Sequence, residues 1–434
     1  MRRERARLVL LTGLVSCLLF PTACRTKLTG ENLAAKARAI HDRVLTVDTH
    51  CDTASRLPGG TWDIGVRHEP GQRASGKIDL PRMAEGGLDA EFFAVFVGQG
   101  ERTEHGYTRA KEWALKTIGA LETMFDKYPN LVGPALTPDD AYRLEKEGRR
   151  AAFIGMENGY PVGKTLSNIE EFYKLGVRYI TLCHSRDNDI CDSSTDRQDQ
   201  EDRGLSDFGR EVVAECNRLG MMVDISHASD RSFADVLRTT KAPVIASHSS
   251  CRALSDNPRN LSDEMIRSLA RNGGVIQICF LSNYVRAPKP NPDREKALQA
   301  LQEKYGARRD MQDEAVRKKA MEEYDVINAR YPEDKATLRE LVDHIEHVIK
   351  LVGIDYVGIG TDFDGGGGVA GCDDVSEMFR VTEELVRRGY SEKEIAQIWG
   401  GNIMRVFRGV VAVSRDKDRP NKRVTLLAQT PRSD

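Results

Sequence analysis

Six short apolar segments of this chain each end in an ionisable side chain, and this pattern limits the possible folds more than any other feature. The six terminal side chains are, in chain order, Asp52, Glu157, His184, His227, His248 and Asp362. In a barrel of alternating parallel strands and helices, reactive groups project from the carboxyl ends of the strands, so residues far apart in sequence meet at one mouth. The pattern predicts a barrel enzyme with a metal site at that mouth.

Eight apolar segments are candidates for the barrel strands. They are residues 44–48, 90–97, 151–156, 178–183, 221–226, 243–247, 274–280 and 356–361. Their richness in Val, Ile, Phe and Leu, with little polar alternation, is typical of parallel strands buried on both faces. Amphipathic helical patterns lie between them, most clearly at residues 337–352. We therefore expect an α/β chain with a (β/α)8 TIM barrel. A doubly wound open sheet is the alternative, although its ligand groups would cluster at one switch point.

The barrel is expected to form a single domain, because α/β barrels with insertions reach this length. We expect this domain at residues 35–412, a linker at 24–34 and a polar tail at 413–434. A charged helical insertion with a proline-rich start, residues 285–335, separates the seventh and eighth strands. Two interpretations of it stay open: a solvated helical hairpin, which we favour, and a rim or lid over the site.

Residues 1–23 have the pattern of a secretory signal peptide. A start with four arginines is followed by an apolar stretch from Leu8 to Phe20 and by small residues before Cys24. Cys24 resembles the lipidated cysteine of bacterial lipoproteins, and Cys17 is the alternative. We therefore expect an exported protein of the periplasm or cell envelope, held at the membrane only through an N-terminal lipid.

Charge and cysteine content exclude several classes of protein. Without residues 1–23 the chain carries 60 basic and 65 acidic residues, so nothing favours nucleic-acid binding. Beyond Cys24 there are seven cysteines, an odd number that rules out a complete disulfide framework. No Cys-x-x-Cys pair is present to bind zinc through sulfur. Because several of these cysteines fall in predicted strands, we interpret them as small buried thiols.

Five residues at or next to the predicted strand ends form a ligand set for two cations. His50 and Asp52 point the same way at the end of the first strand and can hold one cation together. Glu157 is costly to bury unless it is paired or bound to metal. His227 and His248 end successive strands, and neutral imidazole is the commonest zinc ligand. Since a carboxylate has two oxygens, Glu157 is the natural bridge between the two cations.

The remaining histidines receive different interpretations. His344 and His347 lie on a late helix, away from the strand ends, and are predicted to be surface or packing residues. His41, His68 and His105 lie in loops or helix starts without a carboxylate partner pattern, and we assign them no role.

Seven motifs, in order between about residues 35 and 410, closely resemble the membrane (renal) dipeptidase family. They are Asp48–Thr53, Gly155–Glu157, Val177–Ser185, Val223–His227, Pro243–Ser250, Gly358–Gly365 and Gly400–Asn402. The resemblance implies a binuclear zinc (β/α)8 enzyme that hydrolyses dipeptides and tolerates a D-configured C-terminal residue. The segment around Pro58 to Asp63 departs from the pattern of the vertebrate members, which affects the expected specificity rather than the chemistry.

The resemblance also implies roles for individual residues. His50 and Asp52 would hold one Zn²⁺, His227 and His248 the other, and Glu157 and a hydroxide would bridge them. Asp362 would be the catalytic acid and base. His184 and Arg259 would bind the substrate, and His184 would also stabilise the negative charge that develops on the carbonyl oxygen. Tyr284 would be a further substrate contact. The planar guanidinium of Arg259 suits a free C-terminal carboxylate.

Three functional classes stay open. The first is an exported dizinc dipeptidase whose partner is a small dipeptide, for which we also allow a homodimer. The second is a hydrolase of another amide on the same scaffold, such as a β-lactam, a cyclic amide or a modified peptide. The third is a cell-surface binding protein without catalysis, against which the full ligand set and Asp362 argue.

Overall fold

The structure is a computed structural model that describes residues 30–71, 73–196, 198, 201–306 and 314–414. The predicted signal peptide, Cys17 and Cys24, and nearly all of the predicted C-terminal tail lie outside the described residues. Within the described residues, no helix is long and apolar enough to cross a membrane.

Eight parallel strands form the predicted barrel. In sheet order they are β1 (Val47–Cys51), β2 (Ala90–Phe96), β4 (Arg150–Glu157), β5 (Val177–Thr181), β6 (Met222–Asp224), β7 (Ile245–Ser249), β8 (Val275–Cys279) and β9 (Val357–Gly360). A short strand, β3 (Val132–Pro134), pairs with β4 outside this path. Each of the eight predicted strands is present, although the first begins at Val47 rather than Val44.

Backbone hydrogen bonds join the two ends of this sheet at the mouth of the barrel. The Asp362 N–H donates to the His50 carbonyl at 3.0 Å, and the Asp52 N–H donates to the Phe363 carbonyl at 2.8 Å. These bonds bring the segment after β9 beside the end of β1. The first and last predicted site residues, more than 300 positions apart in sequence, are therefore neighbours.

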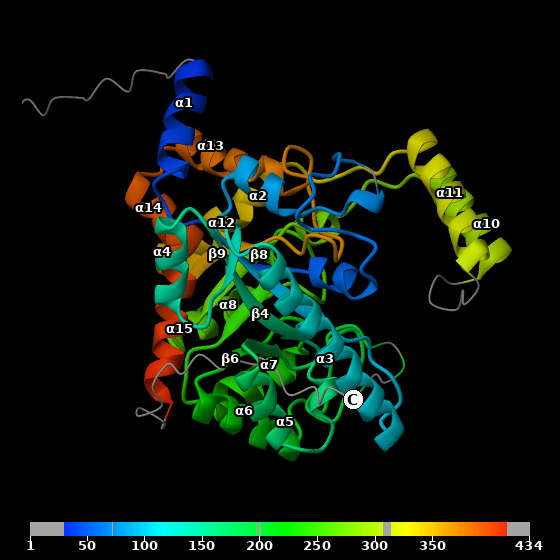
Figure 1. Cartoon of the computed structure of the whole chain (residues 1–434), viewed down its shortest axis with the longest axis vertical. Helices are drawn as coiled ribbons and strands as arrows, with labels where there is room; N and C mark the ends of the chain where they lie inside the picture. The colour runs from blue at the N-terminus through cyan, green and yellow to red at the C-terminus, as the bar shows by residue number, and fades with distance from the viewer. Residues whose placement is uncertain (1–29, 72, 197, 199–200, 307–313, 415–434) are drawn as a thin grey trace, which may run out of the picture.

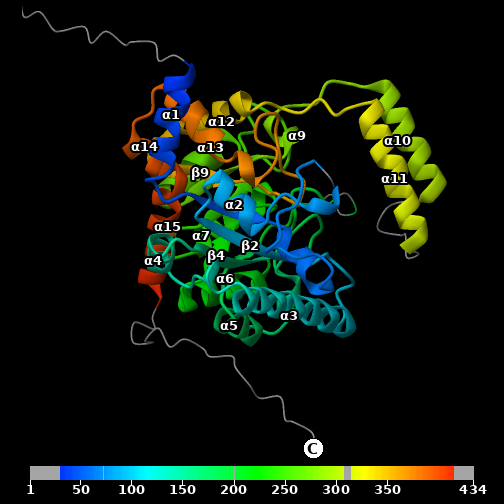
Figure 2. The same ribbon diagram turned by 45° about the horizontal axis from the view of Figure 1, so that its top comes forward.

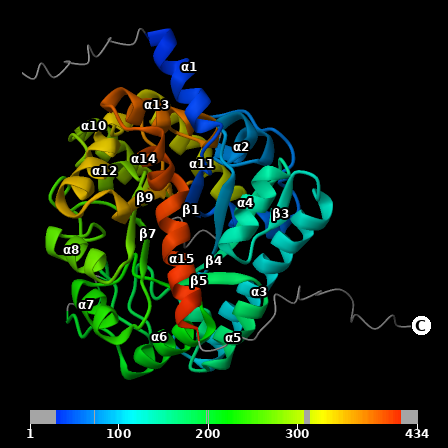
Figure 3. The same cartoon turned by 90° about the vertical axis from the view of Figure 1, so that its left-hand side faces the viewer.

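Helices surround the barrel, as Figure 3 shows in a view in which α15 crosses in front of the strands. They include α1 (Gly30–His41), α2 (Leu80–Gly86), α3 (Glu104–Lys127), α4 (Pro138–Lys146), α5 (Ser167–Lys174), α6 (Asp207–Leu219), α7 (Asp230–Thr239), α8 (Asp263–Arg271), α12 (Leu338–Val352), α13 (Phe379–Arg388), α14 (Glu392–Ala396) and α15 (Asn402–Val413). The predicted stripe of residues 337–352 is confirmed, because α12 buries Leu341, Ile345 and Val348. Its start is fixed by Thr337 and Glu340, which form a capping box.

Helix α15 closes one end of the barrel with apolar side chains. Its Phe407 meets Phe153 of β4 edge-on, with ring centroids 6.0 Å apart, inside a cluster that also holds Val47 and Ile245 near the starts of their strands. This packing fills the amino-terminal end of the barrel. Polar chemistry is therefore concentrated at the opposite, carboxyl end.

The insertion between β8 and β9 forms the predicted helical hairpin. It contains α9 (Ser282–Val285), α10 (Pro292–Tyr305) and α11 (Glu314–Arg330). In Figures 1 and 2, α10 and α11 stand beside each other, apart from the body of the barrel.

The seven cysteines of the described residues are free and buried, in agreement with the sequence-based interpretation.

Candidate metal centre

The structure brings the predicted metal-ligating residues together at the carboxyl end of the barrel. His50 comes from β1, Glu157 ends β4, His227 follows β6 and His248 lies in β7, while Asp52 comes directly after β1. Glu157 is only 2% exposed. A carboxylate with so little access to water requires compensation from its neighbours.

The two oxygens of Glu157 face different histidines. Oε1 lies 3.1 Å from Nε2 of His227 and 3.5 Å from Nε2 of His248. Oε2 lies 3.5 Å from Nε2 of His50, which is in turn 3.7 Å from Oδ2 of Asp52. His227 and His248 thus lie near one oxygen of Glu157, and His50 lies near the other. Three sets of donor atoms are close enough to hold one ion each: His50 with Asp52 and Glu157, Glu157 with His184 and His227, and His50 with His248 and Asp362. The first set contains the predicted pair His50 and Asp52, whereas His227 and His248 fall in different sets, so their assignment to one ion stays a prediction.

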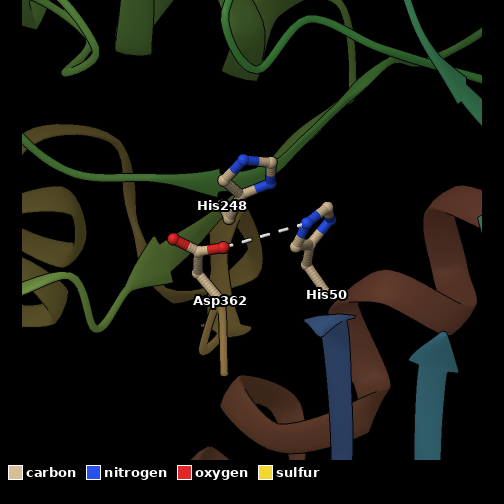
Figure 4. Close-up of side chains that lie close together, drawn as sticks. All are labelled: His50, His248 and Asp362. Atoms are coloured by element: carbon tan, nitrogen blue, oxygen red, sulfur yellow. Dashed lines mark ion pairs between the residues drawn. The ribbon is translucent and has the colours of Figure 1, made fainter. Parts of the chain in front are cut away.

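Two further predicted residues border this group. His184 follows β5, and its Nε2 is 3.6 Å from Oε1 of Glu157. Asp362 follows β9, and its Oδ1 is 3.9 Å from Nε2 of His50. Figure 4 shows the Asp362 carboxylate turned toward the His50 ring, with His248 beside both.

Unusual backbone conformations occur where strands end at this mouth. Among the non-glycine residues that the structure describes, those with positive φ are Asn158, His227, Asp362 and Asp364. Asn158 follows Glu157 directly, and Asp364 lines the same cavity as Asp362. Such conformations cost about 1–3 kcal/mol each and persist where the surrounding structure enforces them. Their concentration here indicates that the mouth is built to aim particular side chains.

Buried carboxylates orient the ligand-bearing segments. Asp48 accepts hydrogen bonds from the N–H of His50 at 3.2 Å and of Thr361 at 2.8 Å. Asp224 accepts from the N–H of Ser226 at 3.0 Å and of Ser247 at 2.8 Å, one residue before His227 and His248 respectively. We predicted no role for these aspartates from the sequence. Their positions two and three residues before a strand-end histidine were the available signal.

The imidazole rings are themselves held by hydrogen bonds. Nδ1 of His50 lies 2.9 Å from the Tyr179 hydroxyl, and Nδ1 of His248 lies 2.8 Å from the Ser247 hydroxyl. These contacts turn the Nε2 atoms toward the shared carboxylate. Partners of this kind fix the orientation of histidines that bind metal.

The electrostatics of the group suit cation binding. Burial lowers the pKa of His227 and of His248 well below its usual value, which keeps both rings neutral. Burial by itself raises the pKa of Glu157, but the charges of His50 and His184 outweigh it and hold that pKa well below normal. For Asp362, burial and the nearby Asp52 charge raise the pKa well above normal. His227 and His248 therefore present neutral rings beside an ionised carboxylate, which is a donor set for a divalent metal. The pKa of His50, in contrast, is raised well above normal, because Tyr179 and Glu157 outweigh the effect of burial.

One buried atom tests this fit directly. Nε2 of His50 has no hydrogen-bond partner in the described structure, although it is buried and aimed at the Asp52 and Glu157 carboxylates. A buried polar atom without a partner is uncommon in folded proteins and calls for an explanation. A cation between His50, Asp52 and Glu157 supplies one.

We refer to His50, Asp52, Glu157, His227 and His248 as the metal-binding group. A cavity of about 950 Å³ opens onto this group. His184 and Tyr284 line it, as predicted for residues that contact a substrate. Arg259 is only 3% exposed and lies next to Tyr284, with its guanidinium carbon 5.3 Å from the centroid of the Tyr284 ring. Its Nη2 donates a hydrogen bond to the His248 carbonyl at 3.0 Å. Its Nε is buried without a hydrogen-bond partner among the described residues.

The other histidines are explained by packing and local pairs. His344 is buried, with Nδ1 accepting from the Cys251 N–H at 3.0 Å, and His347 pairs with Asp263 at 2.7 Å. These two positions agree with their interpretation as packing and surface residues. His68, to which we assigned no role, lies 3.3 Å from Asp79. The pair joins a loop to the start of α2, a contact that sequence spacing does not reveal.

Comparisons with known proteins agree with this geometry. Residues 34–421 match the family model of membrane dipeptidase, peptidase family M19. The chain is 31% identical over 358 residues to dipeptidase tcpJ of Claviceps purpurea, covering 81% of this chain and 74% of that protein. It is 29% identical over 414 residues to dipeptidase ataJ of Aspergillus terreus, covering 90% of each. The crystal structure of the probable dipeptidase PvdM from Pseudomonas aeruginosa matches with a TM-score of 0.74 and 32% identity, over 89% of this chain and 100% of that one.

The shared position of Glu157 leads to a prediction about metal content. Because its two oxygens face both donor groups, Glu157→Ala should retain less bound metal than His50→Ala or His227→Ala. Elemental analysis of the purified, folded proteins measures this. Glu384→Ala, which removes an equally buried carboxylate on α13 away from the cavity, is the matched control and should keep its metal. Unchanged metal content in Glu157→Ala would show that Glu157 is not a ligand.

Proposed function

This chain belongs to the membrane dipeptidase family, peptidase M19, and on this premise we propose that it is a zinc-dependent dipeptidase with two Zn²⁺ per chain. The observation that carries the proposal is the division of donors around Glu157, with His227 and His248 at one oxygen and His50 at the other. Asp52 completes the second group. We propose both L,L and L,D dipeptides as substrates.

The protein side chains supply the proton transfer in the proposed reaction. Zinc held by His50, Asp52, Glu157, His227 and His248 would lower the pKa of a water molecule and polarise the substrate carbonyl. Asp362, at the edge of the group, accepts a proton from the attacking water and returns it to the leaving amine as the C–N bond breaks. His184 lines the cavity beside Glu157 and is placed to donate a hydrogen bond to the carbonyl oxygen as negative charge develops there.

Arg259 is proposed to recognise the free C-terminal carboxylate of the dipeptide. Its Nε is buried without a hydrogen-bond partner among the described residues. Tyr284, over which its guanidinium lies, forms part of the cavity wall. A guanidinium binds a carboxylate through two parallel hydrogen bonds. This contact would restrict the enzyme to substrates whose carboxylate lies one residue beyond the scissile bond.

A hydrolase of another amide on the same scaffold is the second candidate. The cavity of about 950 Å³ has room for such substrates as well as for a dipeptide, because it is at the upper end of the range of roughly 300–1,000 Å³ for small-molecule sites. Comparing dipeptides with β-lactams and cyclic amides on the same zinc-loaded protein distinguishes the two candidates. A dipeptidase should show its highest kcat/KM on the dipeptides.

Asp362→Asn tests the proposed proton transfer. The amide keeps the size of the side chain but cannot shuttle a proton, and such catalysis contributes about 10²–10⁴ in rate. We expect kcat to fall by that order with little change in KM. Metal analysis of the same sample separates this loss from a loss of zinc. A kcat within tenfold of the parent enzyme at full metal content would exclude the role.

Arg259→Met tests recognition of the carboxylate. We expect kcat/KM for free dipeptides to drop while bound metal stays constant, because Arg259 hydrogen-bonds the backbone carbonyl of His248 and not the side chain of a ligand. Discrimination between free and C-terminally amidated dipeptides should largely disappear. If the variant keeps the parental preference for the free acid, the carboxylate is bound elsewhere.

Export and lipidation at Cys24 also belong to this proposal, with the enzyme anchored in the cell envelope. The supporting observation is the signal-like sequence of residues 1–23. Cys24→Ser should move the protein from the membrane fraction to the soluble periplasmic fraction. If it remains in the membrane fraction but Cys17→Ser releases it, the lipidated residue is Cys17.

A further inference from the structure

We propose that helix α11 of the insertion forms the outer wall of the catalytic cavity and that its acidic residues Glu322 and Asp325 favour dipeptides with a cationic side chain. This inference rests on the proposed dipeptidase function and names the substrate class that the site prefers. It assigns the hairpin a part in specificity, which sequence reasoning kept only as an alternative.

The first support is the composition of the cavity wall. The cavity that contains Glu157 and Asp362 is also lined by four residues of α11. These are Lys318, Met321, Glu322 and Asp325. Their spacing of three, four and seven positions places them on one face of the helix. One face of α11 is therefore directed at the metal-binding group across the cavity.

The second support is the attachment of the hairpin to the barrel. Arg286, at the start of the insertion, pairs with Asp334 at 2.8 Å and with Glu340 at 3.0 Å, and donates to the Lys335 carbonyl at 3.1 Å. Glu340 belongs to α12, which packs on the barrel. These contacts attach the first and last residues of the hairpin to the barrel. They therefore determine on which side of the cavity α11 lies.

The third support is the charge left on this face. Within the hairpin, Glu323 pairs with Lys304 at 2.6 Å and accepts from the Tyr305 hydroxyl at 2.7 Å. Glu322 and Asp325 are exposed and make no ion pair in the described part of the chain. On another part of the cavity wall, the charge of Arg56 is balanced by Asp364 at 3.0 Å. The α11 face thus adds two negative charges and one positive charge, from Lys318.

These observations point to the substrate side chain as the recognised group. With the peptide bond near Glu157 and the carboxylate on Arg259, the side chains are the parts of a dipeptide left to reach α11. A side-chain ammonium group there would be attracted by Glu322 and Asp325. Exposed charge pairs typically change an equilibrium constant by about 1.5- to 5-fold. Reversing both acidic charges should therefore change the preference by about tenfold.

The experiment compares substrates that differ in one charge. For zinc-loaded protein, kcat/KM is measured for Lys-Ala against norleucine-Ala and for Ala-Lys against Ala-norleucine. We expect the parent enzyme to prefer lysine in at least one pair. In the Glu322→Lys/Asp325→Lys double variant this ratio should fall about tenfold, whereas Lys318→Glu should raise it. The differences should shrink in high salt, because salt screens exposed charges.

Glu295→Lys is the matched control, since Glu295 is exposed on α10 and does not line the cavity. The inference is overturned if the double variant keeps the parental ratio or if Glu295→Lys changes it equally. Failure of the proposed function looks different, because then the parent enzyme hydrolyses neither the lysine nor the norleucine dipeptides.

Discussion

The burial of one carboxylate among histidines is the constraint on which the site depends. Glu157 is almost inaccessible to water, and its two oxygens face Nε2 atoms of His227 and His248 on one side and of His50 on the other. An ionised group so placed is stable only with nearby positive charge. Burial lowers the pKa of His227 and His248, so these rings do not supply that charge. The pKa of His50 is raised well above normal, so its ring supplies positive charge on one side of Glu157. Divalent cations at the two donor groups would take over that role and would also serve the side of His227 and His248.

The two ends of the barrel differ in composition: the amino-terminal end is packed with apolar side chains, and the carboxyl end carries the polar residues of the site. At the amino-terminal end, α15 and the strand starts form an apolar plug around Phe153 and Phe407. At the carboxyl end, hydrogen bonds between the segments around His50 and Asp362 close the wall. The positive-φ residues occur on the same side, where the chain must turn sharply to present His227 and Asp362. The end of the barrel that is filled with apolar side chains therefore lies opposite the end that carries the positive-φ residues.

Much of this arrangement could be predicted from sequence because parallel strands impose it. Apolar segments that end in His50, Glu157, His227 and His248 identify both the strands and the metal-binding group. Contacts between segments that are distant in sequence could not be predicted in this way, because they depend on how the chain folds. Examples are the His68–Asp79 pair and the hydrogen bond between His50 and Tyr179. The position of α11 at the cavity is another. The position of Arg259 behind Tyr284 also follows from packing rather than from spacing.

Anomalous diffraction at the zinc absorption edge, from crystals of the zinc-loaded protein, would locate the metal ions relative to Glu157. We expect two peaks about 3.5–4 Å apart, as in other two-metal sites. One peak should lie against His50 and Asp52, the other against His227 and His248, with one oxygen of Glu157 bound to each. A single peak, or two peaks that do not share Glu157, would contradict this expectation.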